Sequence, residues 1–279
     1  MKTSLKQEVF FRDLGQIEYR DAWDLQEKLL QENVQVKAEL RNRLTALESQ
    51  GTTGNARPPA RAGTDGDDPR QNESFGLVFV PIDNEENRPT TQHHLLFVEH
   101  PPVYTLGKSG AIENVLISEE ERAAKGISFY NTNRGGDITF HGKEQLVGYP
   151  ILDLEKFYTD IGKYLRNLEE VIIATMADYG VKGERSPGET GVWLDAAVPG
   201  KERKICAMGI RCSRWITMHG FAFNVNTDLS YFDYIIPCGI QNKQVTSLQK
   251  ELGRTLNMNE VKARVKHHFE RVFDVELVG

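Results

Sequence analysis

The chain has 279 residues, of which 39% are hydrophobic and 27% charged, a globular composition that excludes collagen-like, coiled-coil and wholly disordered proteins. Its formal charge of −6 argues against a general nucleic-acid binder. Three cysteines are too few, and odd in number, for a disulfide framework, and they suit a reducing cytoplasm. Because the sequence offers neither a membrane-length apolar run nor a secretion signal, we expect a soluble, cytoplasmic protein.

The first predicted element is a long helix over residues 16–50. Trp23 and Leu30 belong to an apolar series at helical spacing, and Gly51 is expected to end the helix. The following stretch, 51–74, contains no Val, Ile, Leu, Met, Phe, Tyr or Trp. Such a segment buries too little apolar surface to offset its ordering entropy. We therefore predict a polar, mobile insertion that interrupts one domain rather than separating two.

The elements after the insertion alternate between strands and helices. A strand over 76–82 and a polar turn over 83–91 form a predicted hairpin arm, so the inserted region extends to about residue 91. The remaining predicted elements, in chain order, are strand 95–99, helix 161–176 stopped at Gly180, strands 191–196, 203–212 and 215–225, and a helix from about 259. This order predicts a single α+β domain over 1–279, with a mixed or largely antiparallel sheet flanked by helices.

The sequence matches none of the common metal-binding and phosphate-binding motifs. Gly107-Lys108-Ser109 resembles the end of a phosphate-binding loop, but Pro102 stands where that motif needs glycine. Cys206, Cys212 and His219 are spaced like none of the usual zinc sites. We expect no metal site, and we expect the doublets His93-His94 and His267-His268 to be exposed to solvent.

Two residues are candidates for nucleophilic chemistry, although each also has a plain structural interpretation. Cys238 lies between Pro237 and Gly239, which favours a strand end or tight turn that a substrate can approach. A thiolate at pH 7 needs a nearby cation, since an unperturbed thiol is only about 3% ionised there. Lys204, just ahead of an apolar run, can supply that cation. Taken alone, a structural cysteine and a solvated lysine remain the commoner roles.

The segment from Arg134 to Gly142 is the third candidate. Its paired glycines allow the backbone to approach a ligand, and Asp137, Thr139 and His141 share one face if the segment is extended. A glycine-rich turn that enters a strand explains the same residues equally well.

Six sequence blocks in this order resemble the octanoyltransferase family, the lipoyl(octanoyl) transferases of the biotin/lipoate protein ligase fold. The similarity covers roughly residues 9–50 and 75–255. The blocks are LFVEHPPVYTLG over 96–107, RGGDITFHG with QLVGYP over 134–142 and 145–150, GVW over 191–193, KICAMG over 204–209, HGFAFNVN over 219–226 and PCG over 237–239.

This resemblance implies a reaction and a set of site residues. Cys238 is expected to be the nucleophile that carries the acyl group as a thioester, and Lys204 to lower the pKa of its thiol and move protons. The family needs neither ATP nor a metal ion. The implied acyl-binding residues are Arg134, Gly135, Gly136, Asp137, Ile138, Thr139, Phe140, His141, Ala207, Met208, Gly209, Gly220, Phe221 and Ala222.

The resemblance also implies partners. The acyl donor is octanoyl-acyl carrier protein, and the acceptors are lipoyl domains of 2-oxo-acid dehydrogenase complexes and the H protein of glycine cleavage. We expect no nucleic-acid or membrane partner, and we expect a monomer. Lys201, Arg203, Arg211 and Arg214 are candidates to guide the acidic carrier, although scattered solvated charge explains them equally well.

Two features of the sequence depart from the pattern of the octanoyltransferase family. Cys206 stands where relatives more often have a small apolar residue, and strand alternation places it on the same face as Lys204, as a lower-ranked rival nucleophile. The region 51–91 is longer than the usual connection.

The competing functions are an ATP-dependent lipoate–protein ligase and a non-catalytic binder of lipoyl domains or acyl carriers, but Pro237-Cys238-Gly239 favours the transferase.

Overall fold

The computed structural model describes residues 6–51, 89–237 and 244–279. The predicted insertion over 52–74, the strand over 76–82 and Cys238 therefore lie outside the described residues. The chain divides into two compact units, Met1–Val34 with Gln92–Gly279 and Gln35–Thr91. The smaller unit holds the second half of helix α1 (Tyr19–Gly51), and both sheets lie in the larger unit.

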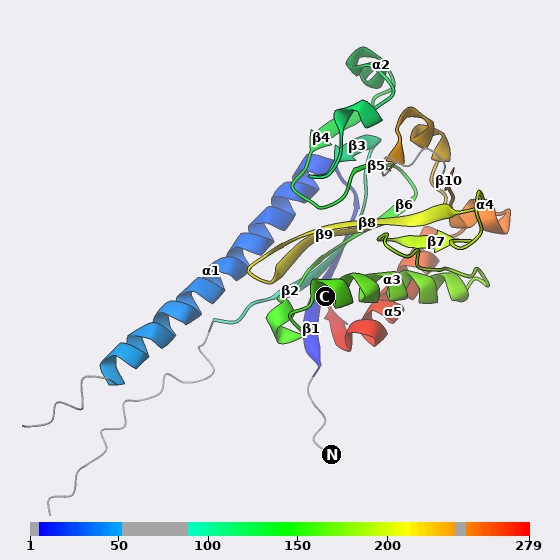
Figure 1. Cartoon of the computed structure of the whole chain (residues 1–279). Helices are drawn as coiled ribbons and strands as arrows, with labels where there is room; N and C mark the ends of the chain where they lie inside the picture. The colour runs from blue at the N-terminus through cyan, green and yellow to red at the C-terminus, as the bar shows by residue number, and fades with distance from the viewer. Residues whose placement is uncertain (1–5, 52–88, 238–243) are drawn as a thin grey trace, which may run out of the picture. The chain divides into compact units, whose positions relative to one another are not determined.

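The larger unit is built on a mixed sheet (Figure 1), as the sequence predicted. Among the described residues its strand order is β10-β8-β9-β6-β2-β1-β11, with β7 also paired to β8. Strands β2, β6, β9 and β8 pair antiparallel, whereas β1 pairs parallel with both β2 and β11. The strands are β1 Gln7–Gln16, β2 His93–Glu99, β6 Gln145–Ile151, β7 Val192–Leu194, β8 Arg203–Ser213, β9 Ile216–Asn224, β10 Gln244–Val245 and β11 Val275–Val278.

A second, three-stranded sheet has the order β4-β3-β5. Its strands are β3 Val103–Leu106, β4 Ser128–Asn131 and β5 Ile138–His141. The short helices are α2 Glu119–Ala124 and α4 Leu248–Leu252, and single 3-10 turns are η3 Ile112–Asn114, η4 Leu154–Lys156 and η5 Leu229–Tyr234.

Helices α3 (Ile161–Ala177) and α5 (Met258–Phe273) pack against the main sheet as their apolar periodicity predicts. The Asp160 side chain caps α3 by accepting a hydrogen bond from the backbone N–H of Lys163. The helix ends at Ala177, before the predicted stop at Gly180, and Gly180 then adopts a left-handed φ of 74° that turns the chain back toward the sheet.

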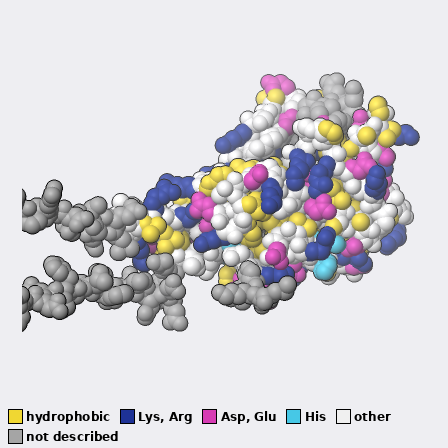
Figure 2. Space-filling model, turned by 60° about the horizontal axis from the view of Figure 1, so that its bottom comes forward, with side chains coloured by type: hydrophobic (Ala, Val, Ile, Leu, Met, Phe, Trp, Pro, Cys, Tyr) yellow, Lys and Arg dark blue, Asp and Glu magenta, His cyan; other side chains and the backbone are white. Residues whose placement is uncertain are grey.

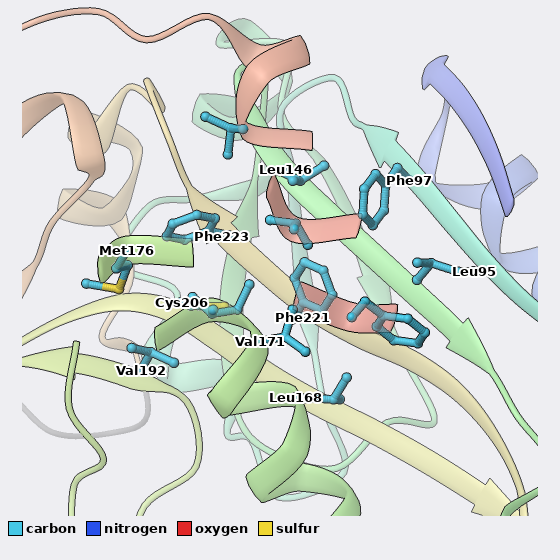
Figure 3. Close-up of a cluster of buried hydrophobic side chains, with 14 of the residues drawn as sticks. Leu95, Phe97, Leu146, Leu168, Val171, Met176, Val192, Cys206, Phe221 and Phe223 are labelled. Carbon is cyan, nitrogen blue, oxygen red and sulfur yellow. The ribbon is translucent and has the colours of Figure 1, made fainter. Parts of the chain in front are cut away.

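The core between this helix pair and the sheet consists mainly of apolar side chains (Figure 3), although α3 also buries Glu169 and Thr175. Phe97, Phe221 and Phe223 from the strands meet Leu168 and Val171 from α3, all buried. A second cluster packs Ala22, Leu29 and Leu30, in the N-terminal half of α1, together with sheet residues that include Val147 and Tyr149. The sheet is therefore covered by helices, and the position of each strand is fixed by packing.

The predicted exposure of the histidine doublets was wrong for three of the four side chains. His93 and His94 are buried at the start of β2, and His268 is buried on α5, while His267 is exposed. The Nδ1 atom of His93 accepts a hydrogen bond from the backbone N–H of Asp153, at 3.2 Å. A neutral imidazole is thus tolerated in the core because the fold supplies its donor, and burial lowers the pKa of His93 to about 4.

The buried His93 predicts acid sensitivity of the fold. Protonation would place an N–H on Nδ1 directly against the Asp153 N–H. Because the unfolded chain takes up this proton near pH 6.5 and the folded chain only near pH 4, stability decreases as the pH falls through this window. His93→Gln should weaken the pH dependence of the free energy of unfolding by about 2 kcal/mol between pH 7.5 and 5, measured by urea denaturation. The matched control His267→Gln should leave the pH dependence of the free energy of unfolding unchanged. Equal pH dependences in the two variants would contradict the role of His93.

Candidate active site

A cavity of about 480 Å³ lies beside the strands of the main sheet. Its walls come from β5, β6, β8 and β9, from Tyr19 at the start of α1, and from the loop over 134–137. Pro237, the residue just before Cys238, also contributes to the wall. The cavity is a concave site of the size that small ligands use.

The floor of the cavity is lined by small side chains on neighbouring strands. Ala207 of β8 lies directly opposite Ala222 of β9, which lies opposite Val147 of β6, so the three side chains share one face of the sheet. Two residues further along β8, beyond the pair Met208 and Phe221, Gly209 lies opposite Gly220. This floor is flat and apolar, which suits an extended hydrocarbon chain lying against it.

The glycine-rich loop packs directly on β8. The Gly135 N–H donates to the Ile210 carbonyl at 2.8 Å, and a Cβ on Gly209 would come within 2.6 Å of the Gly135 carbonyl oxygen. Arg134 is buried and donates from Nη2 to both the carbonyl, at 2.6 Å, and the hydroxyl, at 2.9 Å, of Thr105. The loop is thus held by glycine contacts on one side and by a buried guanidinium on the other.

A directional hydrogen-bond network continues from this loop. The Thr105 hydroxyl, which accepts from Arg134, also lies 3.3 Å from Nε2 of His141 and donates to this nitrogen when the ring is neutral. Nδ1 of His141 then donates to Gln145 at 2.9 Å, and the Gln145 amide donates to Asn224 at 2.8 Å. Every group in the chain has a partner only when His141 is neutral, which agrees with the strongly lowered pKa that burial gives this residue.

Lys204 lies at the end of the cavity where β8 begins. Its backbone pairs with Trp193 of β7 on one edge and with Val245 of β10 on the other. The Lys204 Nζ atom lies 4.5 Å from the centroid of the Trp193 ring, a cation–π contact with a side chain that is 2% exposed. Both the backbone and the ammonium of Lys204 are therefore fixed by neighbouring strands.

Cys206 does not share the face of Lys204, so that prediction was wrong. Trp193 pairs with Lys204, but the preceding Val192 pairs with Cys206, so Ile205 is an extra residue in a β-bulge. The bulge turns both Ile205 and Cys206 into the apolar core, where Figure 3 shows Cys206 beside Val192 and Phe223. Complete burial raises the pKa of the Cys206 thiol well above its ordinary value, which disfavours it as a nucleophile.

The structure places the predicted acyl-binding residues around this cavity, with one exception. Phe140 does not contribute to the wall and instead stacks on Tyr231, with ring centroids 4.6 Å apart. Alternation along β5 explains the difference, since its neighbours Thr139 and His141 line the cavity. The predicted residues that line it are Arg134, Gly135, Gly136, Asp137, Ile138, Thr139, His141, Lys204, Ala207, Met208, Gly209, Gly220, Phe221 and Ala222.

Several wall residues were not predicted from the sequence. Tyr19, Gln145, Tyr149, His219 and Asn224 all line the cavity. Four of them lie within or beside blocks that were noted for other residues, but only the folded chain brings them to one surface.

Several polar side chains in this wall and directly behind it are uncharged near neutral pH. His100 donates from Nδ1 to the Ile17 carbonyl at 2.8 Å and accepts at Nε2 from the Tyr149 hydroxyl at 2.8 Å. Burial lowers the pKa of His100 to about 4 and raises that of Tyr19 to about 12. Burial, together with Arg134 and Arg211, lowers the pKa of His219 to about 3. Tyr19 and His219 are therefore neutral dipoles in a wall that also contains the ionisable side chains of Arg134, Asp137, Glu189 and Lys204.

The four basic residues considered for carrier docking differ in their surroundings. Arg203 forms ion pairs with Glu251 and Asp195, and Arg211 forms one with Glu27. Lys201 and Arg214 are exposed. Figure 2 shows acidic and basic side chains interspersed on the face it presents. Pairing with acids weakens the case for Arg203 and Arg211 as carrier contacts.

The described residues have neither a membrane-spanning helix nor a cluster of metal ligands. None of their helices combines the length and the hydropathy that a membrane span requires. The described residues also contain no group of three or more His, Cys, Asp or Glu side chains placed to hold a metal ion.

Comparisons with known proteins agree on one family. The family model of the lipoyl protein ligase A/B catalytic domain matches residues 82–270. The octanoyltransferase of Christiangramia forsetii is 51% identical over 98% of this chain and 99% of its own length. The octanoyltransferase of Flavobacterium psychrophilum is 48% identical over 97% of this chain and 98% of its own length.

Solved structures show the same fold at low identity. The bipartite lipoate protein ligase of Thermoplasma acidophilum, solved in work that includes its E2 lipoyl domain, aligns with a TM-score of 0.54 at 16% identity, over 67% of this chain and 73% of that one. Lipoate-protein ligase A bound with ATP aligns with a TM-score of 0.55 at 14% identity, over 67% and 75%. The fold, the full-length similarity and the family match lead to one conclusion: the chain belongs to the octanoyltransferase family, acyltransferases of protein lipoylation that carry the lipoyl protein ligase A/B catalytic domain.

Proposed function

We propose that the protein transfers an octanoyl group from octanoyl-acyl carrier protein to a lysine of a lipoyl-accepting domain, through a thioester on Cys238. The observation that carries this proposal is that Lys204 and the predicted acyl-binding segments line one cavity, whose wall reaches Pro237. The acceptors are lipoyl domains of 2-oxo-acid dehydrogenase complexes and the H protein of glycine cleavage.

In the first half-reaction the Cys238 thiolate attacks the carbonyl carbon of the donor thioester. A carbon–sulfur bond forms to Cys238, the bond to the carrier's pantetheine sulfur breaks, and the Lys204 ammonium gives a proton to the departing thiolate. The donor and the enzyme intermediate are both thioesters, so this step is nearly isoenergetic and needs no ATP.

In the second half-reaction Lys204, now a neutral amine, takes a proton from the incoming lysine ammonium. An unperturbed lysine has a pKa near 10.4 and is inert while protonated, so this proton removal makes it nucleophilic. The amine attacks the thioester carbonyl, an amide bond forms, and the second proton of the former ammonium is released to solvent. The Cys238 thiolate leaves, and Lys204 is again protonated. Replacement of a thioester by an amide makes the step favourable.

The cavity matches the acyl part of this substrate. Ala207, Ala222 and Gly209 leave the backbone accessible, so a straight chain can lie against the sheet. Burial of an octanoyl chain contributes about 0.8 kcal/mol for each methylene, several kcal/mol in all. The same apolar contact holds the thioester end beside Lys204.

The other function that a specific observation favours is an ATP-dependent lipoate–protein ligase. The fold is shared with lipoate-protein ligase A bound with ATP. Such a ligase activates a free acid as an adenylate and uses no cysteine thioester, so the two mechanisms differ in whether ATP is required. The Pro237-Cys238-Gly239 sequence and the full-length similarity to octanoyltransferases favour the transferase.

The thioester is tested by intact-mass measurement after mixing the protein with octanoyl-acyl carrier protein in the absence of ATP. We expect one octanoyl adduct that hydroxylamine removes, that is absent from Cys238→Ser and that persists in Cys206→Ser. An adduct that is lost from Cys206→Ser but retained in Cys238→Ser would overturn the assignment of the nucleophile. Transfer that requires ATP would favour the ligase.

The role of Lys204 is tested by Lys204→Met, with Lys201→Met as the matched control on an exposed lysine three positions away. Loss of the proton-transfer group should slow octanoyl transfer by about 10²- to 10⁴-fold, measured in single turnovers at pH 7. The control should retain the full rate at a saturating concentration of the donor, where any contribution of Lys201 to carrier binding no longer affects the rate. A Lys204→Met rate within a factor of two of the wild-type rate would remove Lys204 from the mechanism.

A further inference from the structure

Helix α3 carries a carboxylate among its buried residues. The side chain of Glu169 is completely buried, although most of its buried neighbours on the helix are apolar. Its Oε2 atom accepts hydrogen bonds from Nη1 of Arg166, at 2.7 Å, and from Nε of Arg185, at 3.1 Å. Its Oε1 atom accepts one from the backbone N–H of Gly191, at 3.0 Å. Both oxygens are thus hydrogen-bonded, which a buried carboxylate requires.

The two carboxylate oxygens connect α3 to different parts of the molecule. The side chains of Arg166 and Arg185 are 44% and 37% exposed, so the ion pairs join the carboxylate to the surface. The hydrogen bond from Gly191 is buried, and Gly191 stands directly before β7. Glu169 therefore holds the beginning of β7 at a fixed position against α3.

The backbone of Gly191 lies against the strand that carries Lys204. A Cβ atom on Gly191 would come within 2.5 Å of the Cys206 carbonyl oxygen and 3.7 Å of Cε of Lys204. Gly191 also has a φ of 113°, which favours glycine. The bare backbone of Gly191 thus borders the carbon atom that bears the Lys204 amine.

The same short segment contacts the Lys204 amine a second time. Trp193 lies opposite Lys204 in the β7–β8 pairing, and its ring centroid is 4.5 Å from Nζ of Lys204. Thr190, which precedes Gly191, lines the same cavity as Lys204. A shift of the Gly191 backbone would therefore move the surface against which the Lys204 amine rests.

We propose that Glu169 is a positioning residue for octanoyl transfer, which fixes the Lys204 amine by accepting the hydrogen bond from Gly191. This inference rests on the proposed function, because it gives Glu169 an effect only through proton transfer by Lys204. Glu169 does not contribute to the cavity wall, so it acts through Lys204 and not on the substrate. A misplacement of about 1 Å, even one caused far from the reacting atoms, can slow a reaction by about 10²-fold.

Two conservative variants separate the reach of the side chain from its charge. Glu169→Asp keeps the charge but is one methylene shorter, so it cannot hold both the arginines and the Gly191 N–H. Glu169→Gln keeps the length and an acceptor oxygen, while the partly exposed arginines can turn to solvent. At saturating octanoyl-acyl carrier protein, Glu169→Asp should slow single-turnover adduct formation about tenfold, and Glu169→Gln should stay within about twofold of wild type. The donor concentration that gives half the maximal rate should be unchanged in both.

Thr175→Val is the matched control on α3. It removes a buried hydroxyl whose hydrogen bond, to the Val171 carbonyl at 2.8 Å, stays within the helix. It should retain the wild-type rate. All rates refer to the fraction of protein that forms the adduct, so partial misfolding does not count as slower chemistry.

A double-variant cycle shows whether Glu169 acts through Lys204. The cycle is measured at pH 9, where a thiol with an ordinary pKa near 8.5 is ionised without help from Lys204. In the Lys204→Met background, Glu169→Asp should slow adduct formation no further. An equal slowing in both backgrounds, a wild-type rate in Glu169→Asp, or a Glu169→Gln as slow as Glu169→Asp overturns the inference.

Gly191→Ala tests the same contact from the side of β7, and it decides the matter if Glu169→Asp does not fold. Its Cβ atom must displace the backbone from the Cys206 carbonyl oxygen, so adduct formation should slow, again only while Lys204 is present. A wild-type rate, or an equal slowing in the Lys204→Met background, overturns the inference and leaves the proposed function intact. Failure of the wild-type protein itself to form an octanoyl adduct overturns the proposed function instead.

Discussion

The position of Lys204 is the constraint on which the site depends, and two parts of the fold converge on it. On one side, the buried Glu169 of α3 accepts a hydrogen bond from Gly191 at 3.0 Å and so anchors the start of β7, whose Trp193 lies under the Lys204 ammonium. On the other side, the Thr246 N–H donates to the Lys204 carbonyl at 2.9 Å, and Asn224 donates to the Thr246 carbonyl at 3.0 Å. The amine is thus oriented before any substrate arrives, which is the condition for efficient proton transfer.

A second hydrogen-bond network also reaches Asn224. Its order runs from Arg134 through Thr105 and His141 to Gln145 and Asn224, and it is complete only with an uncharged imidazole. Buried polar groups that are all hydrogen-bonded to one another lose no partner when a hydrocarbon ligand binds beside them. The wall can therefore border an acyl chain and still position the strands around Lys204.

Much of the fold could be predicted because the relevant patterns are local. Helix α3 and strands β8 and β9 follow from apolar periodicity. Strands β1 and β11 were missed because their half-polar sequences form strands through parallel pairing with distant parts of the chain, β1 with β2 and β11, and β11 with β1. In the site, sequence alternation alone put Cys206 beside Lys204, and the bulge at Ile205 reversed this. The backbone of His219, with a φ of 58°, depends on contacts from Gln26 and Asn133, which are distant in sequence, so no local signal marks it.

The central claim is that the Lys204 ammonium ionises the Cys238 thiol. It is measured most directly by the rate of alkylation of Cys238 with iodoacetamide as a function of pH, in protein whose Cys206 and Cys212 are replaced by serine. With Lys204 present, the inflection should lie well below pH 8.5, the ordinary pKa of a cysteine thiol, and Lys204→Met should move it up toward that value. Identical inflections with and without Lys204 would contradict the account.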